Sequence, residues 1–226
     1  MIVMGNNSYE LKAVLFDLDG TLIHSVDHIV DCWQHTARTC LGREMTREEI
    51  LPTLGRTLYD AFEEIAPGRS DELYEVYRAH QVVTHDSTVT MVEGTRETLE
   101  ALKKAGMLLG VVTAKKLVTA MRGIDLFGLA AYFDTIVTLE DSSKHKPSPE
   151  PLLVAAQKLG IRPEEAVYVG DARVDIEAGH AAGMGTAWVT WGAGTLLNLQ
   201  DVKPDFVFDR MDEVLSLLSA PVLRGN

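Results

Sequence analysis

Two aspartates, Asp17 and Asp19, lie two residues apart at the end of the apolar run Ala13–Phe16. In an extended chain, residues at this spacing share one face, although a turn at Gly20 could aim them differently. Two carboxylates this close repel each other unless a cation or a shared proton compensates their charge. Taken alone, the pair is compatible either with a polar strand end before an Asp-Gly turn or with acid–base and metal chemistry.

Further polar residues follow other apolar runs along the chain. Thr113 ends one such run, and Asp171 ends another, with Asp175 four positions beyond it. Individually, these residues could cap a turn, cap a helix or face solvent. If the runs are strands of one parallel sheet, however, their carboxyl ends meet at a common edge. Asp17, Asp19, Asp171 and Asp175 would then offer the oxygen ligands that Mg²⁺ prefers, so we predict a magnesium site there.

A lysine completes this set of residues. Lys146 stands directly before Pro147 and close to a predicted helix N-terminus, which itself favours anions. Carboxylates, a hydroxyl, a lysine and a divalent cation together describe a phosphoryl-transfer pocket. One carboxylate would attack phosphorus, the cation and the lysine would offset charge on the phosphoryl oxygens, and a second carboxyl group would handle protons.

The elements that must position these residues alternate between strand and helix. After the strand that starts at Ala13, we predict strands at Met107–Thr113, Phe133–Leu139, Ala166–Asp171, Thr186–Thr190 and Phe206–Phe208. We predict helices at Thr95–Ala105, Ser148–Gly160, Asp175–Ala182 and Met211–Leu218, and we expect Pro221–Asn226 to fray. This alternation predicts an α/β fold with a doubly wound, Rossmann-like parallel sheet.

The segment between the first strand and the rest of the sheet reads as helical throughout. It contains an amphipathic run at Val26–Leu41, a capping-box start at Thr46, a helix at Thr57–Ala66 and a longer helix from Ser70 or Asp71. We therefore predict an inserted helical cap domain at residues 24–89 and a catalytic core formed by residues 1–23 and 90–226. Arg56, which follows Gly55 at a helix start, is the candidate in this cap for binding an anionic group of a substrate.

Composition limits the classes of function. The 226-residue chain has a net charge of −12 and no block of lysine or arginine, so nothing suggests nucleic-acid binding. We find neither an apolar segment long enough to span a membrane nor a signal peptide. Cys32 and Cys40 form no metal or disulfide pattern, which favours a reduced, cytoplasmic protein. The sequence leaves the oligomeric state open.

In this order, Asp17-Leu18-Asp19-Gly20-Thr21, Val112-Thr113, Lys146-Pro147 and Gly170-Asp171 with Asp175 resemble the four motifs of the haloacid dehalogenase superfamily. The resemblance spans nearly the whole chain, and the helical insertion resembles that superfamily's α-helical cap. Within the superfamily, the segments 50–55, 146–152 and 203–206 are similar to phosphoglycolate phosphatases and a related bacterial inorganic pyrophosphatase.

The resemblance implies a role for each matching position. Asp17 would be the nucleophile that forms an aspartyl-phosphate, and Asp19 would protonate the leaving group and then activate water. Thr113, with Ala114 after it, and Lys146 would hold the phosphoryl oxygens. Asp171 would ligate Mg²⁺ together with Asp17 and the Asp19 carbonyl, and Asp175 would support the metal directly or through water. The expected activity is Mg²⁺-dependent hydrolysis of a small phosphorylated metabolite, either phosphoglycolate or inorganic pyrophosphate.

Other functions fit the same motifs to different degrees. A dehalogenase would need no metal, and Asp19 together with the Asp171 and Asp175 pair argues against it. A sugar-phosphate phosphomutase shares the motifs and the cap, so this alternative stays open. A non-catalytic protein that binds a phosphorylated ligand is the alternative from another class, although it would not need the complete set of reactive residues.

Overall fold

The computed structural model describes residues 10–194, 199 and 201–219. The expected fraying of Pro221–Asn226 concerns residues outside this range. Six parallel strands form the central sheet in the order β5–β4–β1–β6–β7–β8. They are β1 (Ala13–Phe16), β4 (Leu108–Val112), β5 (Thr135–Val137), β6 (Ala166–Gly170), β7 (Gly185–Val189) and β8 (Phe206–Phe208). All six were predicted, and the structure places them within two residues of the expected bounds.

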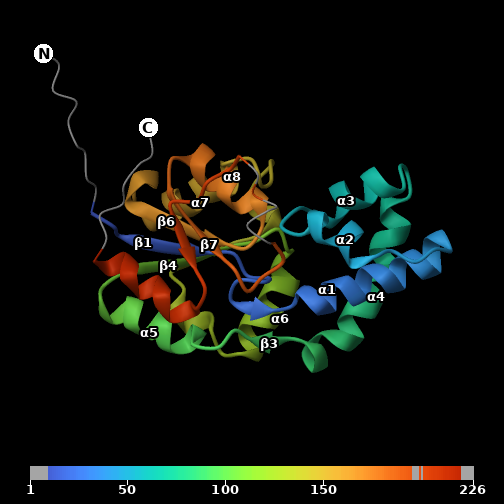
Figure 1. Ribbon diagram of the computed structural model, residues 1–226, viewed down its shortest axis with the longest axis horizontal. Helices are drawn as coiled ribbons and strands as arrows, with labels where there is room; N and C mark the ends of the chain where they lie inside the picture. The colour runs from blue at the N-terminus through green and yellow to red at the C-terminus, as the bar shows by residue number, and fades with distance from the viewer. Residues whose placement is uncertain (1–9, 195–198, 200, 220–226) are drawn as a thin grey trace, which may run out of the picture.

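Helices cover both faces of this sheet (Figure 1). One face packs on α5 (Thr95–Lys104), α6 (Leu117–Leu126) and the 3₁₀ helix η7 (Met211–Leu218); the other packs on α7 (Glu150–Leu159) and α8 (Arg173–Ala182). The buried strand β1 contributes to both layers, since Val14 and Phe16 belong to the first core and Ala13 and Leu15 to the second. The short 3₁₀ helices η3 (Ala130–Tyr132), η4 (Leu139–Asp141) and η5 (Pro163–Glu165) lie in the connections. The predicted doubly wound α/β fold is confirmed.

The helical insertion forms a separate lobe beside the sheet (Figure 1). It consists of α1 (Val26–Thr36), a π-helical turn η1 (Ala37–Leu41), α2 (Arg47–Ile50), the 3₁₀ turn η2 (Leu51–Thr53), α3 (Leu58–Ile65) and α4 (Ser70–Thr88). These helices share a hydrophobic core of their own, centred on Trp33, Phe62 and Tyr77. The predicted capping box at Thr46 is present, because Thr46 and Glu49 exchange hydrogen bonds of 2.8 and 3.3 Å.

One helix, α6, and one pair of short strands were not predicted. Helix α6 was missed because Leu117 and Val118 are exposed, at 51% and 70%. These two apolar residues stand on the face that is normally polar, so the sequence lacks the alternation of apolar and polar faces that identifies a helix. The strands β2 (Ile23–His24) and β3 (Thr90–Met91) pair antiparallel where the insertion leaves and rejoins the core. Each has only two residues, which is too short to show an alternating pattern.

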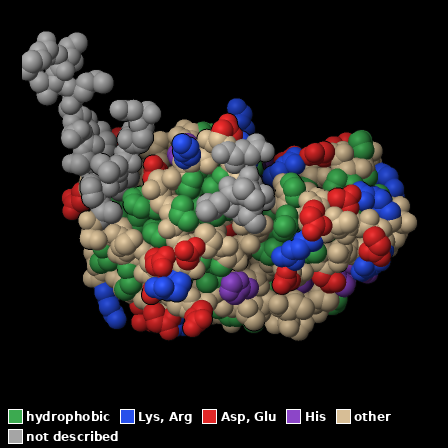
Figure 2. Space-filling view, viewed as in Figure 1, with side chains coloured by type: hydrophobic (Ala, Val, Ile, Leu, Met, Phe, Trp, Pro, Cys, Tyr) green, Lys and Arg blue, Asp and Glu red, His purple; other side chains and the backbone are tan. Residues whose placement is uncertain are grey.

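The surface carries charges of both signs. Figure 2 shows acidic and basic side chains interspersed over the face that it draws. Within the described residues, no helix combines the length and the hydrophobicity needed to cross a bilayer.

Candidate active site

The central strand β1 lies between β4 and β6, so the residues that follow these three strands meet at one edge of the sheet. Asp17 continues the β1–β6 ladder, and its N–H donates to the Val169 carbonyl at 2.9 Å. The following turn depends on Gly20, whose φ is +76°. Its Cα packs against the Asp171 side chain at the position where other residues carry a Cβ atom. A Cβ atom at Gly20 would lie 2.1 Å from Asp171 Oδ2, so only glycine allows this close approach. The turn after Asp17 and Asp19 therefore lies against Asp171, which also brings Asp175 to this edge of the sheet.

Lys146 lies at the centre of the buried cluster. Its Nζ is 3.1 Å from Asp17 Oδ1 and 2.6 Å from Asp175 Oδ1, and it donates to the Tyr168 hydroxyl at 2.9 Å. Burial alone would lower the pKa of Lys146, but Asp17 and Asp175 outweigh it and raise that pKa well above its usual value. The lysine is therefore a fixed positive charge next to the candidate nucleophile.

Asp175 and Asp171 have different surroundings. Both Asp175 oxygens are engaged, Oδ1 by Lys146 and Oδ2 by the Ala172 N–H at 2.9 Å. This second bond explains why α8 begins at Arg173, two residues before the predicted start. Asp171 Oδ2 accepts from the Ala193 N–H at 2.6 Å, while its Oδ1 has only a long 3.3 Å bond from Thr21 Oγ1.

Carboxylate oxygens of Asp17, Asp171 and Asp175 all lie within 4.8 Å of one another. Burial raises the pKa of Asp17 to about 7 in spite of Lys146, and the charges of Asp175 and Asp19 add to the increase. Burial and the charges of Asp175 and Asp17 likewise raise the pKa of Asp171 well above its usual value. One lysine does not neutralise three buried carboxylates, so a divalent cation with oxygen ligands fits this cluster.

Asp19 lies apart from that cluster. Its Oδ1 accepts from Ser25 Oγ at 2.5 Å and from Lys115 Nζ at 2.6 Å. Burial would raise the pKa of Asp19, but Lys115 and Ser25 outweigh burial and hold it below its usual value. Ser25 directly precedes α1, so this contact connects Asp19 to the start of the helical insertion.

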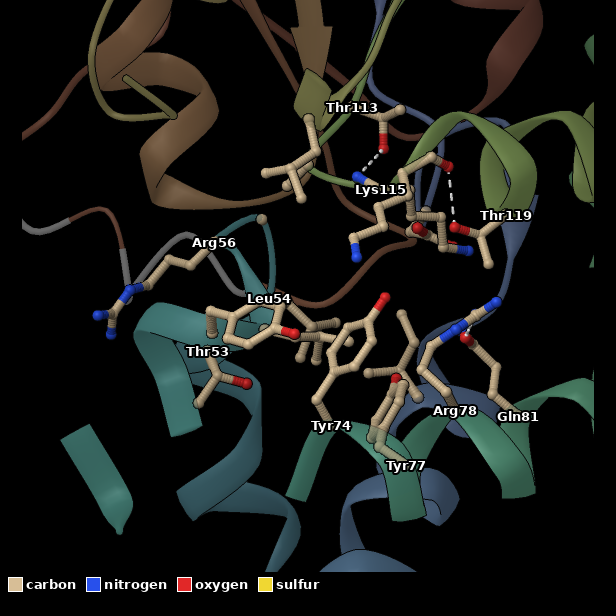
Figure 3. A pocket seen from close by; sticks show the side chains of 18 of the residues that line it. Thr53, Leu54, Arg56, Tyr74, Tyr77, Arg78, Gln81, Thr113, Lys115 and Thr119 are labelled. Atoms are coloured by element: carbon tan, nitrogen blue, oxygen red, sulfur yellow. Dashed lines mark hydrogen bonds and ion pairs between the residues drawn. The ribbon is translucent and has the colours of Figure 1, made fainter. Parts of the chain in front are cut away.

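A cavity of about 90 Å³ lies between the sheet edge and the helical insertion. Its core side carries Asp17, Asp19, Thr113, Ala114, Lys115 and Lys116, and its other wall includes Arg56, Tyr59, Tyr74, Tyr77, Arg78 and Gln81. Figure 3 shows side chains from α4 directed toward the loop that carries Thr113 and Lys115. Arg56 lines the cavity, but its guanidinium pairs with Glu64 at 2.8 Å and points away from the other labelled side chains (Figure 3).

Sequence reasoning did not select several residues of this site. Lys115 and Lys116 stand two and three positions after Thr113, so their position just beyond a predicted strand could have identified them. Tyr168 is a further residue of the site, since its hydroxyl accepts from Lys146 and donates to the Val112 carbonyl at 2.8 Å. A hydroxyl inside an otherwise apolar buried strand was the available signal. His24 and His28, four positions apart, belong to no group of three or more metal-ligating side chains among the described residues.

We expect Tyr168→Phe to lower the free energy of unfolding by about 1–3 kcal/mol, because the change removes buried hydrogen bonds, one of them to a charged ammonium. Urea denaturation monitored by circular dichroism measures this loss. Tyr132→Phe is the matched control, because its hydroxyl bonds Glu100 at 2.9 Å away from the site. Equal effects of the two substitutions would show that Tyr168 does not support Lys146.

Comparisons with known proteins agree with this architecture. Residues 14–189 match the family of haloacid dehalogenase-like hydrolases. Pyrophosphatase PpaX from Bacillus velezensis is 42% identical over 207 residues, which cover 92% of this chain and 96% of that protein.

Solved structures are similar over the same length. A haloacid dehalogenase-like hydrolase from Bacteroides fragilis matches with a TM-score of 0.84 and 28% identity, covering 91% of this chain and 100% of that chain. A predicted phosphoglycolate phosphatase from Haemophilus somnus matches with a TM-score of 0.77 and 26% identity, covering 92% and 98%. The family match runs from β1 through β7 and includes the sheet edge where the acidic cluster lies, so this chain belongs to the haloacid dehalogenase-like hydrolases.

Proposed function

We propose that this protein is a Mg²⁺-dependent phosphatase that hydrolyses a small phosphorylated metabolite, inorganic pyrophosphate or phosphoglycolate, through an aspartyl-phosphate intermediate. One observation carries the proposal: buried Asp17, in contact with Lys146 and close to Asp171, faces a cavity lined by cationic side chains. Such a site combines a nucleophile with fixed positive charge in a protein of net charge −12.

In this mechanism, a carboxylate oxygen of Asp17 attacks phosphorus, and the bond from phosphorus to the leaving group breaks. Lys146 and the Thr113 hydroxyl hold the oxygens of the transferred phosphoryl group. Asp19, whose lowered pKa keeps it ionised beside Lys115, must take up a proton when the substrate binds. It gives that proton to the leaving oxygen and later takes one from the water that hydrolyses the acyl phosphate. Asp175 acts through its contact with Lys146, which it keeps oriented toward Asp17.

Asp17, Asp171 and the Asp19 carbonyl would hold the Mg²⁺, and Asp175 would support them. When bound, the ion would supply electrostatic stabilisation of the charge on the phosphoryl oxygens. The acidic cluster supports this assignment, since its three carboxylates exceed the charge of the single lysine that contacts them.

A screen of phosphate release with Mg²⁺ present tests the proposal. The panel consists of pyrophosphate, phosphoglycolate, p-nitrophenyl phosphate, sugar phosphates and nucleotides. We expect the highest kcat/KM for pyrophosphate or phosphoglycolate; pyrophosphate is tested first because a relative of 42% identity is a pyrophosphatase. If the protein binds Mg²⁺ but releases phosphate from none of them, the hydrolase proposal is wrong.

A phosphomutase uses the same type of phosphorylated aspartate but returns the phosphoryl group to a sugar hydroxyl. The two activities differ in their products. Incubation with a sugar bisphosphate and the corresponding monophosphate would give transfer without net phosphate release in a mutase. We expect phosphate release to dominate.

A further inference from the structure

The cavity contains four cationic side chains, and their partners differ. Lys115 pairs with Asp19, and Arg56 pairs with Glu64. Lys116 Nζ lies 4.6 Å from the ring centre of Tyr74 and 5.7 Å from that of Tyr59. Arg78 donates to Gln81 Oε1. Lys116 and Arg78 thus form no ion pair with any carboxylate that the structure describes.

Arg78 is unusual among the arginines of the described chain. Apart from Arg96, which donates to the Phe127 carbonyl, every other described arginine forms an ion pair with an acidic side chain. Arg78 instead has the neutral amide of Gln81 as its partner, although the protein has a net charge of −12. Its positive charge is therefore available to an anion in the cavity.

The surroundings of Arg78 also favour an anion. Gln81 is 4% exposed and accepts one N–H of the guanidinium, which leaves four of the five N–H donors for a ligand. Tyr77, one residue before Arg78, is 2% exposed and lines the same cavity, and its hydroxyl has no partner among the described residues. In Figure 3, Arg78 and Gln81 extend from α4 toward Lys115 and toward Thr119 of α6.

We propose that Arg78, oriented by Gln81, binds a second anionic group of the substrate, a phosphate or a carboxylate, while the transferred phosphoryl group meets Asp17. This inference rests on the proposed function, because it assigns the substrate class of that same cavity. Phosphate and carboxylate share the geometry that a guanidinium fork recognises. Lys116 lies on the core side of the cavity and adds positive charge for the same group.

The sequence had pointed to Arg56 for this task. Its ion pair with Glu64 and its direction in Figure 3 favour Arg78 instead, since binding an anion at Arg56 would first require breaking that pair. Arg56→Ala is therefore the internal comparison for Arg78→Ala. Arg38→Ala is the matched control, because Arg38 pairs with Glu44 at 3.2 Å and does not line the cavity.

The first experiment measures kcat/KM for phosphoglycolate, pyrophosphate and ethyl phosphate. Ethyl phosphate resembles phosphoglycolate in size but lacks the second anion. We expect Arg78→Ala to reduce the ratio of kcat/KM for either two-anion substrate to that for ethyl phosphate by about 30- to 700-fold, the loss expected when a desolvated charge pair loses one partner. Arg38→Ala should keep the wild-type ratio. A selective loss in Arg56→Ala with none in Arg78→Ala would overturn the assignment.

A second variant tests the neutral partner. Gln81→Glu keeps the shape of the side chain but gives Arg78 a carboxylate partner like those of most other arginines. We expect Gln81→Glu, like Arg78→Ala, to lower the ratio of kcat/KM for two-anion substrates to that for ethyl phosphate. Arg78 is still present in this variant, but its charge is then paired with the introduced carboxylate and not with the substrate. Guanidinium ion added to Arg78→Ala should partly restore the ratio, which it could not do if Arg78 only stabilised the helix.

Binding without turnover provides the last readout. Methylenediphosphonate has two anionic groups and cannot be hydrolysed, so its inhibition constant against p-nitrophenyl phosphate reports binding alone. We expect this constant to rise at least about tenfold in Arg78→Ala. If the wild type hydrolyses p-nitrophenyl phosphate but neither prefers two-anion substrates nor binds the diphosphonate better than phosphate, this inference fails and the phosphatase proposal stands. If it hydrolyses no phosphate ester or anhydride at all, the proposed function itself fails.

Discussion

Replacing Asp17 with asparagine should reduce turnover by roughly 10⁴- to 10⁶-fold, the loss typical of removing a catalytic nucleophile. An amide has nearly the same shape as the carboxylate but cannot serve as the attacking anion. The fold should survive the substitution. Burial already disfavours the charge of Asp17, as its pKa of about 7 indicates, and Lys146 keeps its contact with Asp175. Phosphate release and the melting temperature, measured on the same sample, separate the two effects.

Asp134→Asn is the matched control for Asp17→Asn. Asp134 is likewise an aspartate with a lysine partner, Lys103 at 2.8 Å, but it is exposed and lies outside the cavity. We expect this control to retain activity while losing some stability. Asp17→Asn with nearly normal phosphate release would rule out covalent catalysis by Asp17.

Asp19→Asn should slow turnover by about 10²- to 10⁴-fold, the usual contribution of general acid–base catalysis. Because the nucleophile is intact, substrates with good leaving groups should let a phosphorylated form accumulate. Intact-protein mass spectrometry would then detect one added phosphoryl group, and peptide mapping would place it on Asp17. An unchanged rate would remove Asp19 from the mechanism.

The sheet could be predicted because buried parallel strands are continuous apolar runs that end at polar residues. Helix α6 could not, since its exposed Leu117 and Val118 hide the boundary between its two faces. The boundaries of the helical insertion, placed at residues 24–89, stay a prediction. The π-helical turn at Ala37–Leu41 shows a similar limit, because the apolar spacing that predicted Val26–Leu41 does not distinguish α from π hydrogen bonding.

The core side of the active site could be predicted more fully than its other wall. Asp17, Thr113 and Asp171 each follow a strand, so the topology alone brings them to one edge. The helical insertion offers no such rule. Arg56 and Arg78 both line the cavity, and their difference lies in their partners, Glu64 and Gln81, which only the folded chain reveals.

Removing divalent cations should abolish activity, and the acidic cluster explains why. With a pKa of about 7, Asp17 would be protonated in roughly half of the ion-free molecules at pH 7, and a protonated carboxyl group is a poor nucleophile. Binding of Mg²⁺ favours the ionised form and therefore displaces that proton. Since a raised pKa means that the folded state binds the proton more tightly than the unfolded state, the ion-free protein should lose stability as the pH rises from about 4 to above 7.

Calorimetric titration of chelator-treated, dialysed protein with Mg²⁺ tests this account independently of activity. In two buffers of different ionisation enthalpy at pH 7, we expect Mg²⁺ binding to release protons, because the ion displaces protons held by Asp17 and Asp171, whose pKa values are both raised. Asp171→Asn should weaken Mg²⁺ binding at least about 100-fold, because it removes a carboxylate whose Oδ1 has only one long hydrogen bond. Asp125→Asn, which alters an exposed carboxylate on α6, should bind Mg²⁺ like the wild type. Full activity in excess chelator, or Mg²⁺ binding without proton release at pH 7, would show that the three buried aspartates do not form the metal site.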